Sequence, residues 1–168
     1  AQDFVNYREG FNFKSFFSKL NRLDIKYLTL NDAKYPQNLK QITDAPMVLY
    51  VRGKLSSKDE NAIAIVGSRK MTSYGKEVTE RISGELAGYG ISIVSGLAFG
   101  VDFAAHKSAL SVGGRCLAVL ASGVDMITPK TNEWLGLQII KSGGAIISEF
   151  PPGVEAQKHF FPLEIESF

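Results

Sequence analysis

The sequence predicts an α/β protein with a Rossmann-like parallel sheet, preceded by a small, mostly helical N-terminal segment. Four apolar runs of four or five residues alternate with three longer segments of helical periodicity. Short apolar runs are typical of buried parallel strands, and parallel strands need crossover connections that are usually helices. The expected strands cover residues 62–66, 91–94, 116–120 and 145–148, and the expected helices cover about 74–87, 102–110 and 132–141.

The N-terminal segment is expected to span residues 1–55, and the Rossmann-like domain residues 56–168. Phenylalanines and leucines recur at helical spacing over 11–23, so we expect a helix whose aromatic stripe packs in the core. Further along, we expect an extended piece at 27–30, a short helix at 35–42, a lead-in strand at 47–51 and a polar connection at 56–61.

We expect an extended Rossmann fold that is incomplete at its C-terminus. In such a truncated sheet the four parallel strands should have the order 3-2-1-4, numbered along the chain. The fourth strand, 145–148, would then be an exposed edge beside strand 62–66. An apolar edge presents unpaired backbone groups and favours aggregation.

The composition is that of an ordinary globular protein, with 168 residues, 45% of them hydrophobic and 21% charged. The net charge is only +2, so any binding of nucleic acid has to come from a local basic patch. A single cysteine excludes an internal disulfide, and the two histidines and the cysteine have no zinc-site spacing. No run is apolar enough to span a membrane. We therefore expect a cytoplasmic protein with no metal and no cofactor.

The carboxyl ends of the predicted strands carry the most informative residues. The first strand ends in Gly67, Ser68, Arg69 and Lys70, the second in Ser95 and Gly96, and the other two also end in serine. Ligands of open α/β sheets bind at this edge, where turns and helix N-termini attract anions. Glycines allow close approach, hydroxyls can donate to phosphate, and arginine suits a phosphate oxygen pair. Four such turns together favour a phosphate-bearing ligand.

Neither standard nucleotide fingerprint is present. The dinucleotide motif needs three glycines, but the window from Gly67 to Thr72 has one, and Ser95-Gly96 stands where an acidic residue is expected. A P-loop fails as well, because Gly75-Lys76 is followed by glutamate. The pattern therefore points to a polyanion whose phosphates are contacted individually.

No convincing catalytic set emerges. Asp102 and His106 stand four residues apart at a helix start and could form an acid–base pair, although an N-cap aspartate beside a packed or surface histidine is favoured. Glu149 is a possible base but stands alone, and no nucleophile can be assigned. Near the end, Lys158 precedes Phe160 and Phe161. A cation beside aromatic rings suits single-stranded nucleic acid, but a proline-bounded loop with its phenylalanines in the core is equally open.

With these segments placed, the chain resembles the DNA-processing protein A family (DprA/Smf) from about residue 25 to 162. The combination of Gly-Ser-Arg with Ser-Gly-Leu-Ala-x-Gly-x-Asp is highly specific. The matching text includes Tyr35-Pro36, Leu49-Tyr50, Ile65 to Arg69, Tyr74-Gly75, Val94 to Ala98, Gly100, Asp102, Ala105-His106, Ser122 to Asp125, Pro129, Asn132, Gly144, Ser148-Glu149, Pro151 to Gly153 and Phe161-Pro162.

The resemblance implies an extended Rossmann domain that binds single-stranded DNA and delivers it to the RecA recombinase in natural transformation or recombination. It also implies a homodimer without established catalysis. Carried over by motif, the DNA contacts would be Gly67, Ser68 and Arg69 together with Lys158 and Phe160 or Phe161, while Ser95, Gly96 and Gly100 line the same site.

The final residues depart from the family pattern. Relatives continue after Phe-Pro-x with Arg-Asn-Arg-Ile-Ile, whereas this chain has acidic residues from Glu164 to its end at Phe168. Codons AGA AAT AGA ATC ATT that lose their first base encode Glu-Ile-Glu-Ser followed by Phe or Leu. We therefore expect a frameshifted, truncated product that lacks later strands and part of a dimer surface, and the nucleotide sequence of the gene would test this.

Two alternatives remain. One is an enzyme of the phosphoribohydrolase-like (lysine decarboxylase-like) group acting on nucleoside monophosphates, although its Pro-Gly-Gly-x-Gly-Thr motif departs here at Pro152-Gly153-Val154. The other is a non-functional fragment.

Overall fold

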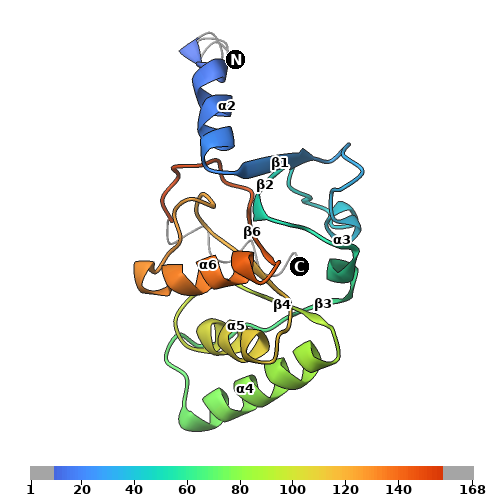
Figure 1. The fold of residues 1–168 in the computed structure, drawn as a ribbon, viewed down its shortest axis with the longest axis vertical. Coiled ribbons are helices and arrows are strands. Elements are labelled where there is room, and N and C mark those ends of the chain that lie inside the picture. Colours follow the sequence, from blue (N-terminus) through green and yellow to red (C-terminus); the bar gives the residue numbers. More distant parts are fainter. Residues whose placement is uncertain (1–9, 157–168) are drawn as a thin grey trace.

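The computed structural model describes residues 10–156, which form a mixed six-stranded sheet in the order β1-β2-β6-β5-β4-β3 (Figure 1). The strands are β1 (Ile25–Thr29), β2 (Val48–Gly53), β3 (Ala62–Ala64), β4 (Ser92–Ser95), β5 (Cys116–Val119) and β6 (Ala145–Ser148). The helices are α2 (Phe13–Arg22), α3 (Gln37–Lys40), α4 (Ser73–Gly88), α5 (Val101–Ser111) and α6 (Glu133–Lys141), with the 3-10 helices η1 (Ser57–Asn61) and η2 (Lys130–Asn132).

The predicted alternation of strands and helices is confirmed. Strands β3, β4, β5 and β6 are parallel to one another, and α4, α5 and α6 are the crossovers between them. The first three predicted strands also pair in the expected 3-2-1 arrangement.

The predicted place of the fourth strand is wrong. Strand β6 pairs with β5, not with β3, and on its other side it pairs antiparallel with β2. The lead-in strand of the N-terminal segment therefore covers the edge that was expected to be exposed, and β1 extends the sheet by pairing with β2. Strand β6 follows β5 in the sheet as it does in the chain, so the run of four parallel strands contains no reversal of order. Strand β2, which precedes the first parallel strand in the chain, takes the place on the other side of β6.

The exposed parallel edge is β3 instead. Ile63 is 40% exposed and Val66, just beyond the strand, is 51% exposed, so the prediction that 62–66 is a fully buried strand is wrong. A strand with one neighbour can bury only part of each side chain, which the apolar sequence alone does not reveal.

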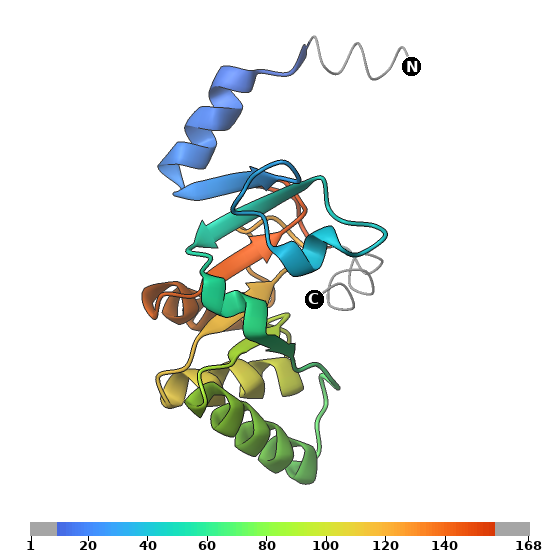
Figure 2. The same ribbon diagram turned by 90° about the vertical axis from the view of Figure 1, so that its right-hand side faces the viewer.

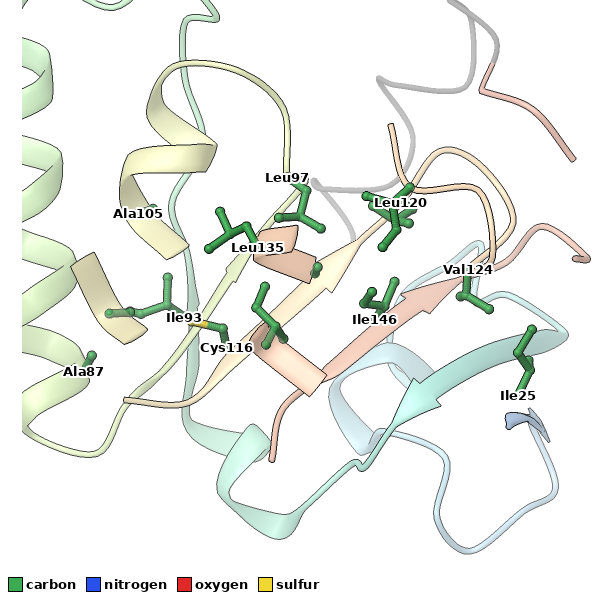
Figure 3. Close-up of a cluster of buried hydrophobic side chains, with 14 of the residues drawn as sticks. Ile25, Ala87, Ile93, Leu97, Ala105, Cys116, Leu120, Val124, Leu135 and Ile146 are labelled. Atoms are coloured by element: carbon green, nitrogen blue, oxygen red, sulfur yellow. The ribbon is translucent and has the colours of Figure 1, made fainter. Parts of the chain in front are cut away.

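The sheet separates two clusters of buried hydrophobic side chains. In Figure 2 the crossover helices and the segment around α3 lie on opposite sides of the strands. Alternate residues along each strand face opposite layers, so Ile93 and Cys116 pack with the helices while Val94 and Leu117 face the other side. The helix-side layer joins residues of α4, α5 and α6 and appears in close-up in Figure 3. The opposite layer is closed by Tyr35, Leu39 and neighbouring residues from the segment around α3. Because successive strands are added in one direction, all three crossover helices lie on the same face.

Helix α2 stands at one end of the molecule, against β1 (Figures 1 and 2). Leu20 is buried and Phe16 packs against the core, but Phe13 and Phe17 are exposed, so the expectation of a core aromatic stripe is only partly met. Lys19 ties the helix to the body through an ion pair with Asp125, with 3.4 Å between Nζ and Oδ2.

Candidate functional site

Among the predicted site residues that the structure describes, those of the turn after β3 are the most exposed. Gly67, Ser68, Arg69 and Lys70 are all exposed, at the carboxyl edge of the sheet between β3 and α4. The Lys70 amide donates to the Ser68 hydroxyl oxygen at 3.1 Å, which gives the turn a local hydrogen bond. Helix α4 then begins, with the Thr72 hydroxyl oxygen accepting from the Gly75 amide at 3.0 Å. The turn thus presents two adjacent cationic residues on a short, locally ordered backbone.

This turn lies against the N-terminus of α5. The Val101 amide donates to the Ser68 carbonyl at 3.2 Å. A Cβ added to Gly100 would lie 2.1 Å from that same carbonyl oxygen, and one added to Gly67 would lie 2.9 Å from the Val101 side chain. Gly100 also has a φ of +78°, where a side chain is strained. Glycine at these two positions is what lets the two backbones meet. We call residues 67–70 together with Gly100 the carboxyl-edge site.

Behind this site, Ser95 and Gly96 are committed to internal hydrogen bonds. The Ser95 hydroxyl is fully buried and donates to the Ile65 carbonyl at 2.7 Å. The Gly96 amide donates to the Asp102 carboxylate at 3.1 Å. These residues join β3, β4 and α5 and support the exposed turn from below.

Asp102 acts as an internal anchor for this part of the chain. It lies in the first turn of α5 with Gly100 as the N-cap, so the prediction of an N-cap aspartate is wrong by two positions. Burial raises the pKa of its carboxyl, and hydrogen bonds from the Gly96, Ala98 and Gly67 backbone oppose this. The carboxylate near a helix N-terminus is also favoured by the helix dipole.

His106 does not form an acid–base pair with Asp102. Its ring is completely buried, and within residues 10–156 neither ring nitrogen has a hydrogen-bond partner. Burial lowers its pKa to about 4, partly opposed by the Ser95 backbone, so the ring is neutral near pH 7. Cys116 is likewise unsuited as a nucleophile, because burial raises the pKa of its thiol to about 12.

The other two strand ends are less available than expected. The Ser122 hydroxyl is buried and donates to the Met126 carbonyl at 2.7 Å, and buried Ser148 accepts from the Phe150 amide at 2.9 Å. Of the four strand-end serines, only Ser68 is exposed, so the structure leaves one of the four hydroxyls available to a ligand at this edge. Glu149 is exposed at the end of β6 and adds a negative charge to this edge.

The structure brings together Gly67, Ser68, Arg69, Lys70 and Gly100 on the surface, with Ser95 and Gly96 beneath them. Lys158, Phe160 and Phe161 lie outside the described residues. Asn132 belongs to the matching family pattern, but sequence reasoning missed its role. Its side chain is buried and donates through Nδ2 to the Leu97 carbonyl at 2.8 Å. That bond holds the turn after β4 against the start of α6, and no sequence pattern links residues 35 positions apart.

Residues 10–156 contain no group of three or more His, Cys, Asp or Glu side chains placed to hold a metal ion. In the same range, no helix has the length and hydropathy needed to cross a bilayer.

Fold and site together define an α/β protein with an exposed cationic turn, held on a helix N-terminus at the carboxyl edge of its parallel strands. The profile of the family described as DNA recombination-mediator protein A matches residues 26–164, and the chain belongs to this family.

Individual relatives agree. The Smf protein of Synechocystis is 38% identical over 94% of this chain and 40% of its own length. The Smf protein of Escherichia coli is 40% identical over 76% of this chain and 34% of its own length. The X-ray structure of DNA processing protein A from Streptococcus pneumoniae superposes with a TM-score of 0.75 at 35% identity, covering 87% of this chain and 52% of that one.

DNA processing protein A from Helicobacter pylori, whose structure describes a single-stranded DNA-binding mode, has a TM-score of 0.68 at 32% identity. It covers 81% of this chain and 61% of that one. The chain thus spans about half the length, or less, of most of the relatives it matches.

Proposed function

We propose that this chain binds single-stranded DNA through the carboxyl-edge site. The observation that carries the proposal is the exposed turn from Gly67 to Lys70, whose backbone lies on the N-terminus of α5. Helix N-termini and backbone amides favour anions, and arginine pairs well with phosphate oxygens. The single-stranded DNA-binding mode described for the Helicobacter pylori relative supports the same choice of ligand.

The residues of the site are better suited to binding phosphate groups than to catalysing a reaction. Asp102 accepts a hydrogen bond from the Gly96 amide, and within residues 10–156 the buried ring of His106 has no hydrogen-bond partner, so the two do not form an acid–base pair. We therefore propose a non-catalytic role. Incubation with nucleoside monophosphates would test it, since release of free base would instead support the phosphoribohydrolase-like alternative.

Binding to fluorescein-labelled oligo(dT), measured by anisotropy at several salt concentrations, tests the proposal. Loss of a charge-assisted phosphate contact in Arg69→Ala should weaken binding about tenfold or more. It should also reduce the slope of log K against log salt by about 0.7, the value for one single-strand phosphate. Arg81→Ala, in α4, removes the same charge from an exposed position outside the site and is the matched control. Equal affinities and slopes for the two variants would overturn the proposed role of Arg69.

Further DNA contacts and two protein partners are also proposed for this chain. Lys158, Phe160 and Phe161 are proposed to complete the DNA contact with one cation and two rings. Delivery of DNA to RecA, self-association as a homodimer and a cytoplasmic location are also proposed on the strength of the family. A RecA binding measurement and sedimentation of the purified chain would test the two partners.

A further inference from the structure

An aromatic patch at the starts of α5 and α6 lies beside the carboxyl-edge site. One of its rings, Phe103, also packs against the helix-side core, but the other two are half exposed. We call this surface the α5–α6 aromatic patch, formed by Phe99, Phe103 and Trp134. Phe99 is 50% exposed and Trp134 is 49% exposed. The rings of Phe103 and Trp134 meet edge to face, with their centroids 5.9 Å apart and an interplanar angle of 74°. Large aromatic side chains left half in solvent are worth explaining when they gather at one place.

The patch is continuous with the carboxyl-edge site. Phe99 directly precedes Gly100, the residue that lies against the Ser68 carbonyl. Phe103 follows within the first turn of α5, about 5 Å further along the helix axis. Trp134 reaches the same place from α6, because Asn132 fixes the start of that helix to the carbonyl of Leu97. Helices α5 and α6 lie side by side in Figure 1.

The charges around the patch suit a polyanion that also carries flat rings. Lys107 Nζ lies 5.8 Å from the centroid of the Phe103 ring, a cation–π distance, and its side chain is exposed. Lys130, exposed in η2 just before α6, adds a second cation, and Glu133 is the opposing charge. Bases stack on exposed aromatic faces while lysines neutralise the backbone beside them. Leu137, also exposed, extends the apolar strip by one turn of α6.

We infer that single-stranded DNA leaving the carboxyl-edge site continues over the α5–α6 aromatic patch, where bases stack on Trp134 and Phe99. The inference rests on the proposed function, because the patch gains its ligand from the neighbouring turn. The patch would lengthen the bound stretch of DNA, with contacts to bases rather than to phosphates. Because every base can stack on an aromatic ring, these contacts would raise affinity without selecting a sequence.

The chain contains one tryptophan, so Trp134 reports on its own surroundings. Titration of the full chain with oligo(dT) should quench the tryptophan emission in step with the rise in anisotropy of a labelled oligonucleotide. Trp134→Ala should weaken binding about fivefold or more, the lower end of the effect of one base–aromatic stack, and Trp134→Phe should recover most of it. The loss should be larger for an oligonucleotide of about twelve bases than for one of four, which can occupy the carboxyl-edge site alone.

Tyr89→Ala is the matched control, since Tyr89 is 85% exposed at the opposite end of α4 from the site and should leave affinity unchanged. Binding without quenching, with Trp134→Ala equal to Tyr89→Ala, would overturn the inference and leave the proposed function intact if Arg69→Ala still loses affinity. An unaltered quench and affinity in Arg69→Ala, with a loss in Trp134→Ala, would keep the patch and overturn the role of the turn. Failure of the chain to bind any oligonucleotide would overturn both. Thermal melts of each variant separate loss of binding from loss of folding.

Discussion

Replacing Gly100 by alanine tests whether the turn after β3 depends on its close backbone contact with the N-terminus of α5. A Cβ at this position would lie 2.1 Å from the Ser68 carbonyl oxygen and 2.8 Å from two atoms of Arg69. Contacts under 3.0 Å are essentially never made by real Cβ atoms, so the turn has to retreat by roughly 1 Å. The retreat would break the 3.2 Å hydrogen bond from the Val101 amide to the Ser68 carbonyl. Gly100→Ala should therefore displace the cationic turn from the helix N-terminus.

Gly113→Ala is the control for a positive φ in open space. Gly100 differs from it in the clash and also in its ψ of −124°, which lies outside the left-handed helical region. Gly113 has a φ of +75°, close to the +78° of Gly100, but an added Cβ would meet nothing within 4 Å. Alanine in a left-handed conformation costs about 1–2 kcal/mol, and this is the whole effect expected at Gly113. For alanine at Gly100 the sparsely populated backbone conformation costs about 1–3 kcal/mol and overpacking adds about 1–3 kcal/mol. Gly100→Ala should therefore lower the free energy of unfolding by roughly 2–6 kcal/mol.

Urea unfolding measures these differences, and oligo(dT) anisotropy at low temperature, where both variants stay folded, measures the consequence for the site. Gly100→Ala should bind DNA more weakly than Gly113→Ala, because the turn has lost its alignment with α5. Equal affinities of the two folded variants would show that the contact between the turn and α5 is not required for DNA binding, contrary to this prediction. Equal unfolding free energies would show that the two backbones do not meet as closely as described.

Two further predictions concern His106 and the exposed strand β3. Burial lowers the pKa of His106 from 6.5 to about 4, so the unfolded chain binds a proton that the folded protein excludes. The stability contributed by neutral His106 is complete above pH 6.5 and is lost as the pH falls towards 4, by at most about 1.4 kcal/mol per pH unit. His106→Leu should therefore flatten the pH dependence of the free energy of urea unfolding over this window, relative to the unmodified chain. Parallel pH profiles for the two proteins would contradict the prediction. Ile63→Lys places a charge on the exposed edge strand β3 and should lower concentration-dependent light scattering, which reports aggregation. Ile82→Lys adds the same charge at a residue that is 42% exposed on α4 and should leave the scattering unchanged. Equal reductions in the two variants would show that the added charge, and not its place on the edge strand, is responsible.

The local elements could be predicted because their signals are local. Each parallel strand is a short apolar run that stops at small residues, and each crossover helix ends near glycine, as at Gly88 and Gly143. The position of strand β6 could not be found in this way. Its sequence is equally apolar whether its neighbour is β3 or β5, and its second neighbour, β2, comes from a segment almost 100 residues earlier. Pairing partners are a property of the whole sheet and not of the strand.

The same distinction applies to the site. The exposed turn at Gly67 to Lys70 follows from a motif in consecutive residues, and the structure places those residues as expected at a strand end. Ser95 and Ser122 had the same apparent chemistry in the sequence, but each hydroxyl is turned inward to a backbone carbonyl, at Ile65 and Met126. Which serine meets solvent depends on tertiary contacts, since a buried hydroxyl has to find a partner wherever the fold provides one.

The order of the strands also bears on the kind of ligand that the edge can hold. Where strand order reverses, crossover helices switch faces and open a crevice suited to a compact dinucleotide. Strands β3 to β6 follow one another without reversal, so α4, α5 and α6 begin in sequence along the same edge on the same face. Such an edge offers a row of helix starts rather than one enclosed crevice. The carboxyl-edge site occupies the starts of α4 and α5, and the aromatic patch the starts of α5 and α6, so a ligand that contacts both has to be extended along the row. This geometry favours a strand of linked phosphates and bases over a single nucleotide, which supports the ligand proposed for the turn.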